Sequence, residues 1–131
     1  MGGGIAFSGI VTSGLGEGAF YMSMEHYKKE IKGKLGFDAY PGTLNIKTDK
    51  KINLFDEKKA VIIEGFESEG KVFYGTRCYK AKIKNINGSI LVPDKSRHED
   101  NIIEFIAPVH LKSELGIKDG DEIRVEIRWQ K

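Results

Sequence analysis

Three glycines at alternate positions, Gly14, Gly16 and Gly18, mark the first segment that could do chemistry. Glycine tolerates positive φ angles and lets backbone N–H groups approach an anion closely, so such a loop can hold phosphate oxygens. No Gly-Lys-Ser/Thr follows, which excludes a P-loop, and no long helix follows, which argues against a dinucleotide-binding turn. The alternative is a flexible turn between strands, which the residues by themselves slightly favour.

Thr43 and Asn45, in the segment 41–45, form the second candidate. Residues two apart on a strand share one face, so these two side chains lie together while Leu44 and Ile46 face the core. A hydroxyl and an amide oxygen in that arrangement can hold Mg²⁺, which takes few protein ligands and keeps water or phosphate oxygens. The alternative, which the residues alone favour, is a pair of polar residues on the solvent face of a strand.

Glu104 is the third candidate, because it is a carboxylate inside the apolar run 102–106. By alternation it faces solvent, whereas in a pocket it would suit general-base work. Ser96 and His98 lie in the preceding polar loop, residues 93–100, and with a carboxylate they suggest a catalytic triad. They are too close along that loop, however, and no nucleophile elbow surrounds the serine, so a hydrolase is not expected.

Histidine and cysteine offer no metal site. His26, His98 and His110 lack metal-ligand spacing, and we expect them to be surface or hydrogen-bonded residues. Cys78, the one cysteine, lies in a predicted strand and is expected to pack in the interior. A single cysteine cannot form an internal disulfide, which fits a reducing cytoplasm.

The length of 131 residues suits one domain covering residues 1–131. Lys and Arg number 21 against 19 Asp and Glu, so the net charge of +2 is lower than a dedicated DNA-binding domain usually carries. The N-terminus lacks a signal-peptide pattern, and the longest nearly apolar stretch, 102–107, is far shorter than the ~20 residues that span a bilayer. We expect a monomer with no nucleic-acid or membrane partner.

Short strands dominate the predicted secondary structure, and glycine (16) far outnumbers proline (3), as in chains whose strands are joined by tight turns. A helix is predicted over 24–35, because Met24, Tyr27, Ile31 and Leu35 repeat at helical spacing, with Ser23 as N-cap and Gly36 at its end. A shorter helix is predicted from Pro108 through Leu115. Strands are predicted at 5–12, 19–23, 43–47, 60–66, 71–83, 89–92, 101–106 and 121–128, with turns at Glu69-Gly70, Asn87-Gly88 and Asp119-Gly120.

Alternating β–α units are absent, so a doubly wound nucleotide fold is not expected. The pattern predicts a mainly β chain, folded as a compact and mostly antiparallel barrel with one or two short helices covering its openings. The segment 115–123 resembles the Gly-Asp turn of cradle-loop barrels. That turn occurs in enzymes and in transcription-factor modules, so it supports a fold more than a function.

Taken together, these segments resemble the CTP-dependent riboflavin kinases of archaeal type. The matching pieces occur in order and cover nearly the whole chain: Ser13-Gly14-Leu15-Gly16-Glu17-Gly18, Gly36-Phe37-x-x-Tyr40-Pro41-Gly42-Thr43-Leu44-Asn45, Val92-Pro93, Ile102-Ile103-Glu104-x-Ile106-Ala107-Pro108, and the Gly-Asp turn. The resemblance implies a six-stranded cradle-loop barrel that transfers the γ-phosphate of CTP to the 5′-hydroxyl of riboflavin, giving FMN and CDP. Some relatives carry an N-terminal helix-turn-helix domain, for which this chain is too short.

The resemblance also implies site residues. Thr43 and Asn45 would bind Mg²⁺, while Ser96 and Glu104 would face the flavin and Glu104 would accept the hydroxyl proton. Ser96 stands where the family has threonine, which keeps the hydroxyl. Two segments would hold the nucleotide: Gly14, Leu15, Gly16, Glu17, Gly18 and Ala19 in the first, and Val109, His110, Leu111 and Lys112 in the second. A preference for cytosine comes from the resemblance alone.

Two other function classes stay open. A non-enzymatic DNA-binding barrel would share the Gly-Asp turn, although the near-balanced charge argues against it. A flavin-binding carrier without kinase activity would keep the flavin pocket but would have no use for a metal site.

Overall fold

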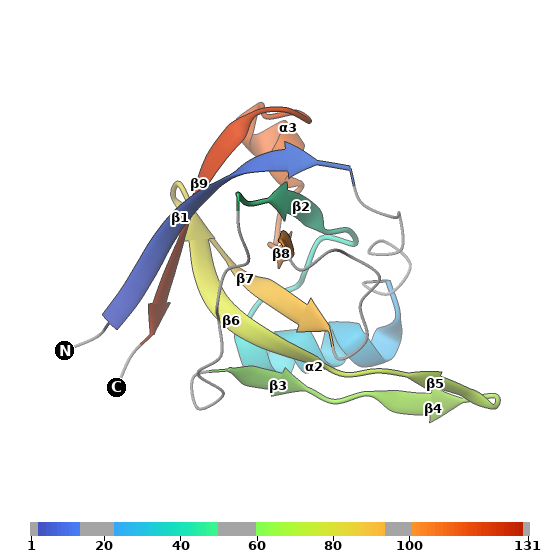
Figure 1. Cartoon of the computed structure of the whole chain (residues 1–131). Helices are drawn as coiled ribbons and strands as arrows, with labels where there is room; N and C mark the ends of the chain where they lie inside the picture. The colour runs from blue at the N-terminus through green and yellow to red at the C-terminus, as the bar shows by residue number, and fades with distance from the viewer. Residues whose placement is uncertain (1–2, 14–22, 50–59, 94–100, 130–131) are drawn as a thin grey trace.

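The computed structural model describes residues 3–13, 23–49, 60–93 and 101–129, which form nine strands and two helices (Figure 1). The strands are β1 (Gly3–Thr12), β2 (Leu44–Lys47), β3 (Val61–Ile63), β4 (Phe66–Ser68), β5 (Lys71–Phe73), β6 (Thr76–Ile83), β7 (Ile86–Pro93), β8 (Ile102–Ile106) and β9 (Glu122–Trp129). The helices are α2 (Glu25–Leu35) and α3 (Leu111–Leu115).

Six strands close into an antiparallel barrel, which confirms the predicted fold class. Hydrogen-bonded neighbours follow the order β6-β7-β8-β2-β1-β9, and β9 also pairs with β6 to complete the ring. β3 adds to the free part of β6, and β4 and β5 form a separate two-stranded sheet that projects from the barrel (Figure 1). Closure of the ring pairs every barrel strand on both sides, which protects backbone groups that an open sheet would leave exposed.

The barrel interior is apolar because alternate residues of each strand point inward. Phe105 and Ile90 are fully buried there. Leu44 and Ile46 belong to the same core, as the alternation in 43–47 predicts. Helix α3 adds Leu111 to this core, so the short helix closes one end of the barrel (Figure 1).

Helix α2 packs on the outside of the barrel wall through a second apolar cluster. Its Tyr27, Ile31 and Leu35 are buried at helical spacing, as predicted. The cluster they form includes Cys78 of β6 and Leu91 of β7. The helix therefore covers the wall of the barrel, and the prediction that it covers an opening is wrong.

The start of α2 differs from the prediction, whereas its end agrees with it. Met24, and not the predicted Ser23, is the N-cap, and no side chain caps the first turn. Met24 packs against the second cluster, so apolar contact positions the start of this helix. Gly36 ends it as predicted, with a φ of 85° in the left-handed region that favours glycine. Among the described residues, no helix is long and apolar enough to span a membrane.

The strand predicted at 60–66 is divided into β3 and β4, and the strand predicted at 71–83 is divided into β5 and β6. Gly65 shows why, because a Cβ at this position would lie 2.3 Å from the carbonyl oxygen of Phe73 and 2.8 Å from the nitrogen of Gly75. The two backbones cross too closely here for two continuous paired strands. The β4–β5 hairpin therefore leaves the barrel as a separate arm.

The hairpin predicted at Asn87-Gly88 exists, but its turn lies earlier, at Lys84-Asn85, where Lys84 has a φ of 54°. Asn87 and Gly88 are instead strand residues of β7, paired with β6. A Cβ at Gly88 would lie 2.1 Å from the carbonyl oxygen of Ile106. Close approach of β8 explains this glycine, which is a common role for glycine inside a strand.

Helix α3 begins at Leu111, with His110 as its N-cap, and not at the predicted Pro108. The predicted turns at Glu69-Gly70 and Asp119-Gly120 are confirmed by positive φ angles of 78° at Gly70 and 96° at Gly120. Apart from Ser23, the extended segment predicted at 19–23 lies outside the described residues, as does most of the loop 93–100.

Cys78 has no exposed surface and packs in the second cluster, as predicted. Burial raises the pKa of its thiol to about 12. Since the thiolate is the reactive form, we expect negligible reaction of the native protein with the thiol reagent DTNB near pH 8. Denaturation in guanidinium chloride should release one reactive thiol per chain. Rapid labelling of the native protein would contradict this burial.

Candidate functional site

The sheet register places four residues in one row across neighbouring strands. Thr12 of β1 pairs with Asn45 of β2, and Asn45 pairs with Glu104 of β8. Glu104 in turn pairs with Leu91 of β7, which belongs to the cluster beneath α2. Because directly paired residues point to the same face, Asn45 and Glu104 lie on the outer face of the barrel wall.

Thr43 lies on the same face as this row, since it precedes Asn45 by two residues. Its hydroxyl donates a hydrogen bond to Oε1 of Glu104 at 3.2 Å. The prediction that Thr43 and Asn45 share a face, with Leu44 and Ile46 directed to the core, is confirmed. The two candidate segments 41–45 and 102–106 thus meet in one place.

Asn45 is buried, with 8% of its surface exposed, so the alternative that it lies on a solvent face is wrong. Within the described residues, its Oδ1 accepts no hydrogen bond. A buried polar atom without a partner costs roughly 1–3 kcal/mol, so this oxygen is suited to a ligand that is not part of the protein chain. With the Thr43 hydroxyl and the Glu104 carboxylate nearby, the oxygens present fit a hard divalent cation such as Mg²⁺.

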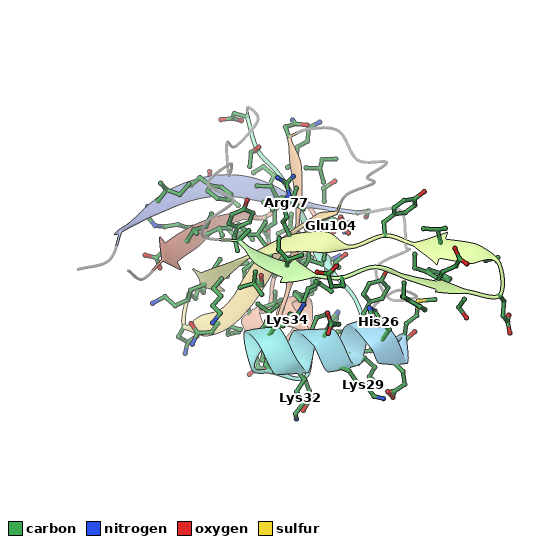
Figure 2. The ribbon with its side chains drawn as sticks, turned by 90° about the horizontal axis from the view of Figure 1, so that it is seen from below. His26, Lys29, Lys32, Lys34, Arg77 and Glu104 are labelled. Atoms are coloured by element: carbon green, nitrogen blue, oxygen red, sulfur yellow. The ribbon has the colours of Figure 1, made fainter. Side chains whose placement is uncertain are left out.

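Glu104 is half-buried and hydrogen-bonded, so it is more than a carboxylate on a solvated strand face. Three lysines of α2 have directions or partners away from Glu104. Lys29 and Lys32 point away from the sheet (Figure 2). The ammonium of Lys34 turns toward the strands but is bound at 2.9 Å by Glu30 and at 2.7 Å by a carbonyl oxygen of β3.

The end of β1 is bound on its other side to the turn that precedes β9. The N–H of Val11 donates to the carbonyl of Asp121, and the N–H of Gly120 donates to the carbonyl of Val11, each at 2.8 Å. The predicted glycine segment, residues 14–19, follows β1 directly and lies outside the described residues, as does Ser96. The end of β1, which precedes the glycine segment in the sequence, therefore lies between Asn45 on one side and the turn on the other.

Lys112, in the second predicted nucleotide segment, reaches the same end of β1. Its Nζ lies 2.9 Å from Oδ1 of Asp119, and the hydroxyl of Ser13 donates to Oδ2 of the same carboxylate. These contacts bring Ser13, which precedes the segment predicted at 14–19, to the same corner of the barrel as Lys112.

The other residues of the second segment differ in what they can offer a ligand. His110 is exposed, and its ring lies over Tyr40 with centroids 4.9 Å apart and planes tilted by 31°. Its Nδ1 is 2.6 Å from the hydroxyl of Ser113. Leu111 is buried in the barrel core and Val109 packs against that core, so they offer a ligand chiefly their backbone groups.

Sequence reasoning did not place Ser13 or Asp119 in the site. They are 106 positions apart, and no periodic pattern connects residues at that separation. The one signal that could have pointed to them is their place in the sequence, because Ser13 directly precedes the glycine segment and Asp119 directly precedes Gly120 of the predicted turn.

In the described part of the chain, no group of three or more His, Cys, Asp or Glu side chains could hold a metal ion. His26 is instead a satisfied structural residue, as expected. Its Nε2 lies 2.7 Å from the carbonyl oxygen of Glu64, and its ring packs on Phe66 with centroids 4.4 Å apart.

Comparison with known proteins adds independent evidence. The family model CTP-dep_RFKase, described as a domain of unknown function, DUF120, matches residues 11–127. A riboflavin kinase of Archaeoglobus fulgidus is 43% identical over 129 residues, which cover 95% of this chain and 55% of the relative. Riboflavin kinases of Methanocella arvoryzae (42% identical; 96% of this chain, 58% of the relative) and Pyrococcus furiosus (45%; 90% and 56%) are similar too.

The chain spans a little more than half the length of these relatives. The family model covers most of the chain, including the strands that carry Asn45 and Glu104. The chain therefore belongs to the CTP-dependent riboflavin kinase family.

Proposed function

We propose that this chain transfers the γ-phosphate of CTP to the 5′-hydroxyl of riboflavin, giving FMN and CDP. The observation that carries the proposal is the row Thr12–Asn45–Glu104. It sets the end of β1 beside a carboxylate and an amide oxygen that has no hydrogen-bond partner among the described residues. Phosphoryl transfer depends on positioning and charge neutralisation more than on covalent chemistry, and this row supplies groups for both.

Glu104 accepts the proton of the riboflavin 5′-hydroxyl as the hydroxyl oxygen bonds to the γ-phosphorus. The bond between the γ-phosphorus and the β,γ-bridging oxygen breaks, and CDP leaves with that oxygen. Thr43 donates its hydrogen bond to Oε1 of Glu104 and so orients the carboxylate. Ser96 is assigned to the flavin from the resemblance.

Mg²⁺ is proposed as the cation for this reaction. The Asn45 amide oxygen and the Thr43 hydroxyl are the groups that would hold it. When bound, the ion neutralises charge on the phosphate oxygens as the γ-phosphoryl group moves. The burial of Asn45 supports this assignment, since a ligand atom fixed by packing loses little freedom on binding.

The nucleotide is proposed to lie at the end of β1, where Ser13 and Lys112 share the Asp119 carboxylate. Backbone N–H groups of residues 14–19 suit phosphate oxygens, and Lys112 contributes a positive charge. His110, in the predicted segment 109–112, is exposed. CTP is proposed as the donor from the name of the family model, since no contact among the described residues distinguishes cytosine from adenine.

The test is an incubation of the protein with riboflavin and Mg²⁺ together with CTP, ATP, GTP or UTP in turn, followed by chromatographic separation of FMN from riboflavin. We expect FMN with CTP, far less with the other three nucleotides, and none when EDTA removes the metal. FMN formed from ATP in preference to CTP would overturn the donor while keeping the kinase. Riboflavin binding without FMN formation would favour a flavin carrier, and binding of DNA without riboflavin would favour a DNA-binding barrel.

A further inference from the structure

Three polar side chains from distant parts of the sequence meet at the end of β1. The carboxylate of Asp119 accepts a hydrogen bond from the hydroxyl of Ser13 through Oδ2 and binds the ammonium of Lys112 through Oδ1 at 2.9 Å. Ser13 follows β1, Lys112 is in α3, and Asp119 is in the turn before β9. One carboxylate therefore connects the segment that leads into Gly14 with the segment that carries Lys112.

Backbone hydrogen bonds hold the turn that carries Asp119. Gly120 donates to Val11 at 2.8 Å, and the N–H of Lys118 donates to the Asp121 carboxylate at 2.9 Å. Both side chains are partly exposed, at 38% for Lys112 and 47% for Asp119, but the lysine side chain is longer and has more rotatable bonds. The short side chain of Asp119 on its hydrogen-bonded turn therefore restricts where the ammonium of Lys112 lies.

The carboxylate of Asp119 is ionised at neutral pH. The hydrogen bond from Ser13, and then the one from Lys112, hold the pKa of Asp119 below its ordinary value. An ammonium has three N–H donors, so Lys112 can keep its bond to Asp119 and still donate to a phosphate oxygen.

We propose that Asp119 is a positioning residue for nucleotide binding, which holds the Lys112 ammonium and the Ser13 hydroxyl together at the end of β1. The inference rests on the proposed function, because it assigns the nucleotide phosphates to this corner. Asp119 itself does not touch the substrate. Its contribution to binding passes through Lys112 and Ser13.

The effect of geometry can be separated from the effect of charge by comparing two variants. Asp119→Ala removes both hydrogen bonds and the negative charge. Asp119→Asn also removes the charge, but its amide oxygen can accept from Lys112 while its NH₂ group donates to Ser13. Because both variants remove the repulsion between carboxylate and phosphate, any difference between them reports on position.

The experiment measures the Kd of CTP by calorimetric titration, and the KM values of CTP and riboflavin, for both variants in the wild-type and the Lys112→Ala backgrounds. We expect Asp119→Ala to bind CTP about two- to fivefold more weakly than Asp119→Asn, the range typical of an exposed ion pair. The KM of riboflavin should stay constant. In the Lys112→Ala background most of the difference between the two variants should disappear.

The pair Lys32–Asp38 provides a matched control, since its Nζ and Oδ2 are 2.8 Å apart on an exposed surface of the molecule. Asp38→Ala should leave the Kd of CTP unchanged. Equal CTP affinity of Asp119→Ala and Asp119→Asn would overturn the positioning role, while nucleotide binding by the wild type still supports the proposed function. A difference that persists in full without Lys112 would overturn the part of that role assigned to the lysine. Failure of the wild type to bind any nucleoside triphosphate would overturn both.

Discussion

Replacing Glu104 by Gln is expected to lower kcat for FMN formation by about 10²–10⁴-fold, the usual contribution of a positioned acid–base group. Glutamine keeps the size of the side chain and can still accept the hydrogen bond that Thr43 donates at 3.2 Å. It cannot take a proton from the riboflavin hydroxyl. CTP affinity should change little, so steady-state rates measured at varied riboflavin and varied CTP should place the loss in kcat.

Glu126→Gln is the matched control for this change. Glu126 is also a half-buried glutamate in a barrel strand, but it lies in β9, where it pairs with Lys82. Its substitution should leave kcat near the wild-type value. A loss of only about tenfold in Glu104→Gln would assign Glu104 an orienting role, since a loose transition state needs little base assistance. Unchanged kcat and unchanged KM for riboflavin would exclude Glu104 from the site.

Replacing Asn45 by Leu is expected to raise the Mg²⁺ concentration for half-maximal rate by at least about tenfold. Loss of a group that merely supports a metal ligand costs roughly 10–100-fold in metal affinity, and loss of a ligand should cost no less. The metal-free variant should be as stable as the wild type or more stable. An apolar side chain of similar size removes the cost of the buried Oδ1, which has no partner among the described residues.

Thermal melting provides a readout of the Asn45 substitution that does not depend on activity. Mg²⁺ should raise the Tm of the wild type, because a ligand that binds only the folded state stabilises it, and the shift should vanish in Asn45→Leu. Asn101→Ala is the control. Asn101 directly precedes β8 and Thr48 directly follows β2, and the Asn101 amide donates to the Thr48 carbonyl at 3.0 Å. That variant should lose stability and keep its Mg²⁺ requirement. An Asn45→Leu protein with the wild-type requirement and Tm shift would place the metal elsewhere.

Features that depend on local periodicity were determined by the sequence itself. Alternation in 43–47 predicts which side chains enter the core, and both Leu44 and Ile46 do. Helical spacing over 24–35 predicts the buried face of α2, and Gly36 predicts its end. These features follow from the period of two in strands and of 3.6 in helices, which residues carry with them into any fold.

Contacts between distant segments were decided by the tertiary structure. Thr43 and Glu104 are 61 positions apart, and only the register between β2 and β8 shows that they share a hydrogen bond. The burial of Asn45 was likewise decided by the tertiary structure, because the pattern of its own segment favours a solvent-facing side chain. The turn at Lys84-Asn85 replaces the one predicted at Asn87-Gly88, because Gly88 meets β8. The physical reason is common to all three, since register, burial and close approach depend on the strand that lies opposite.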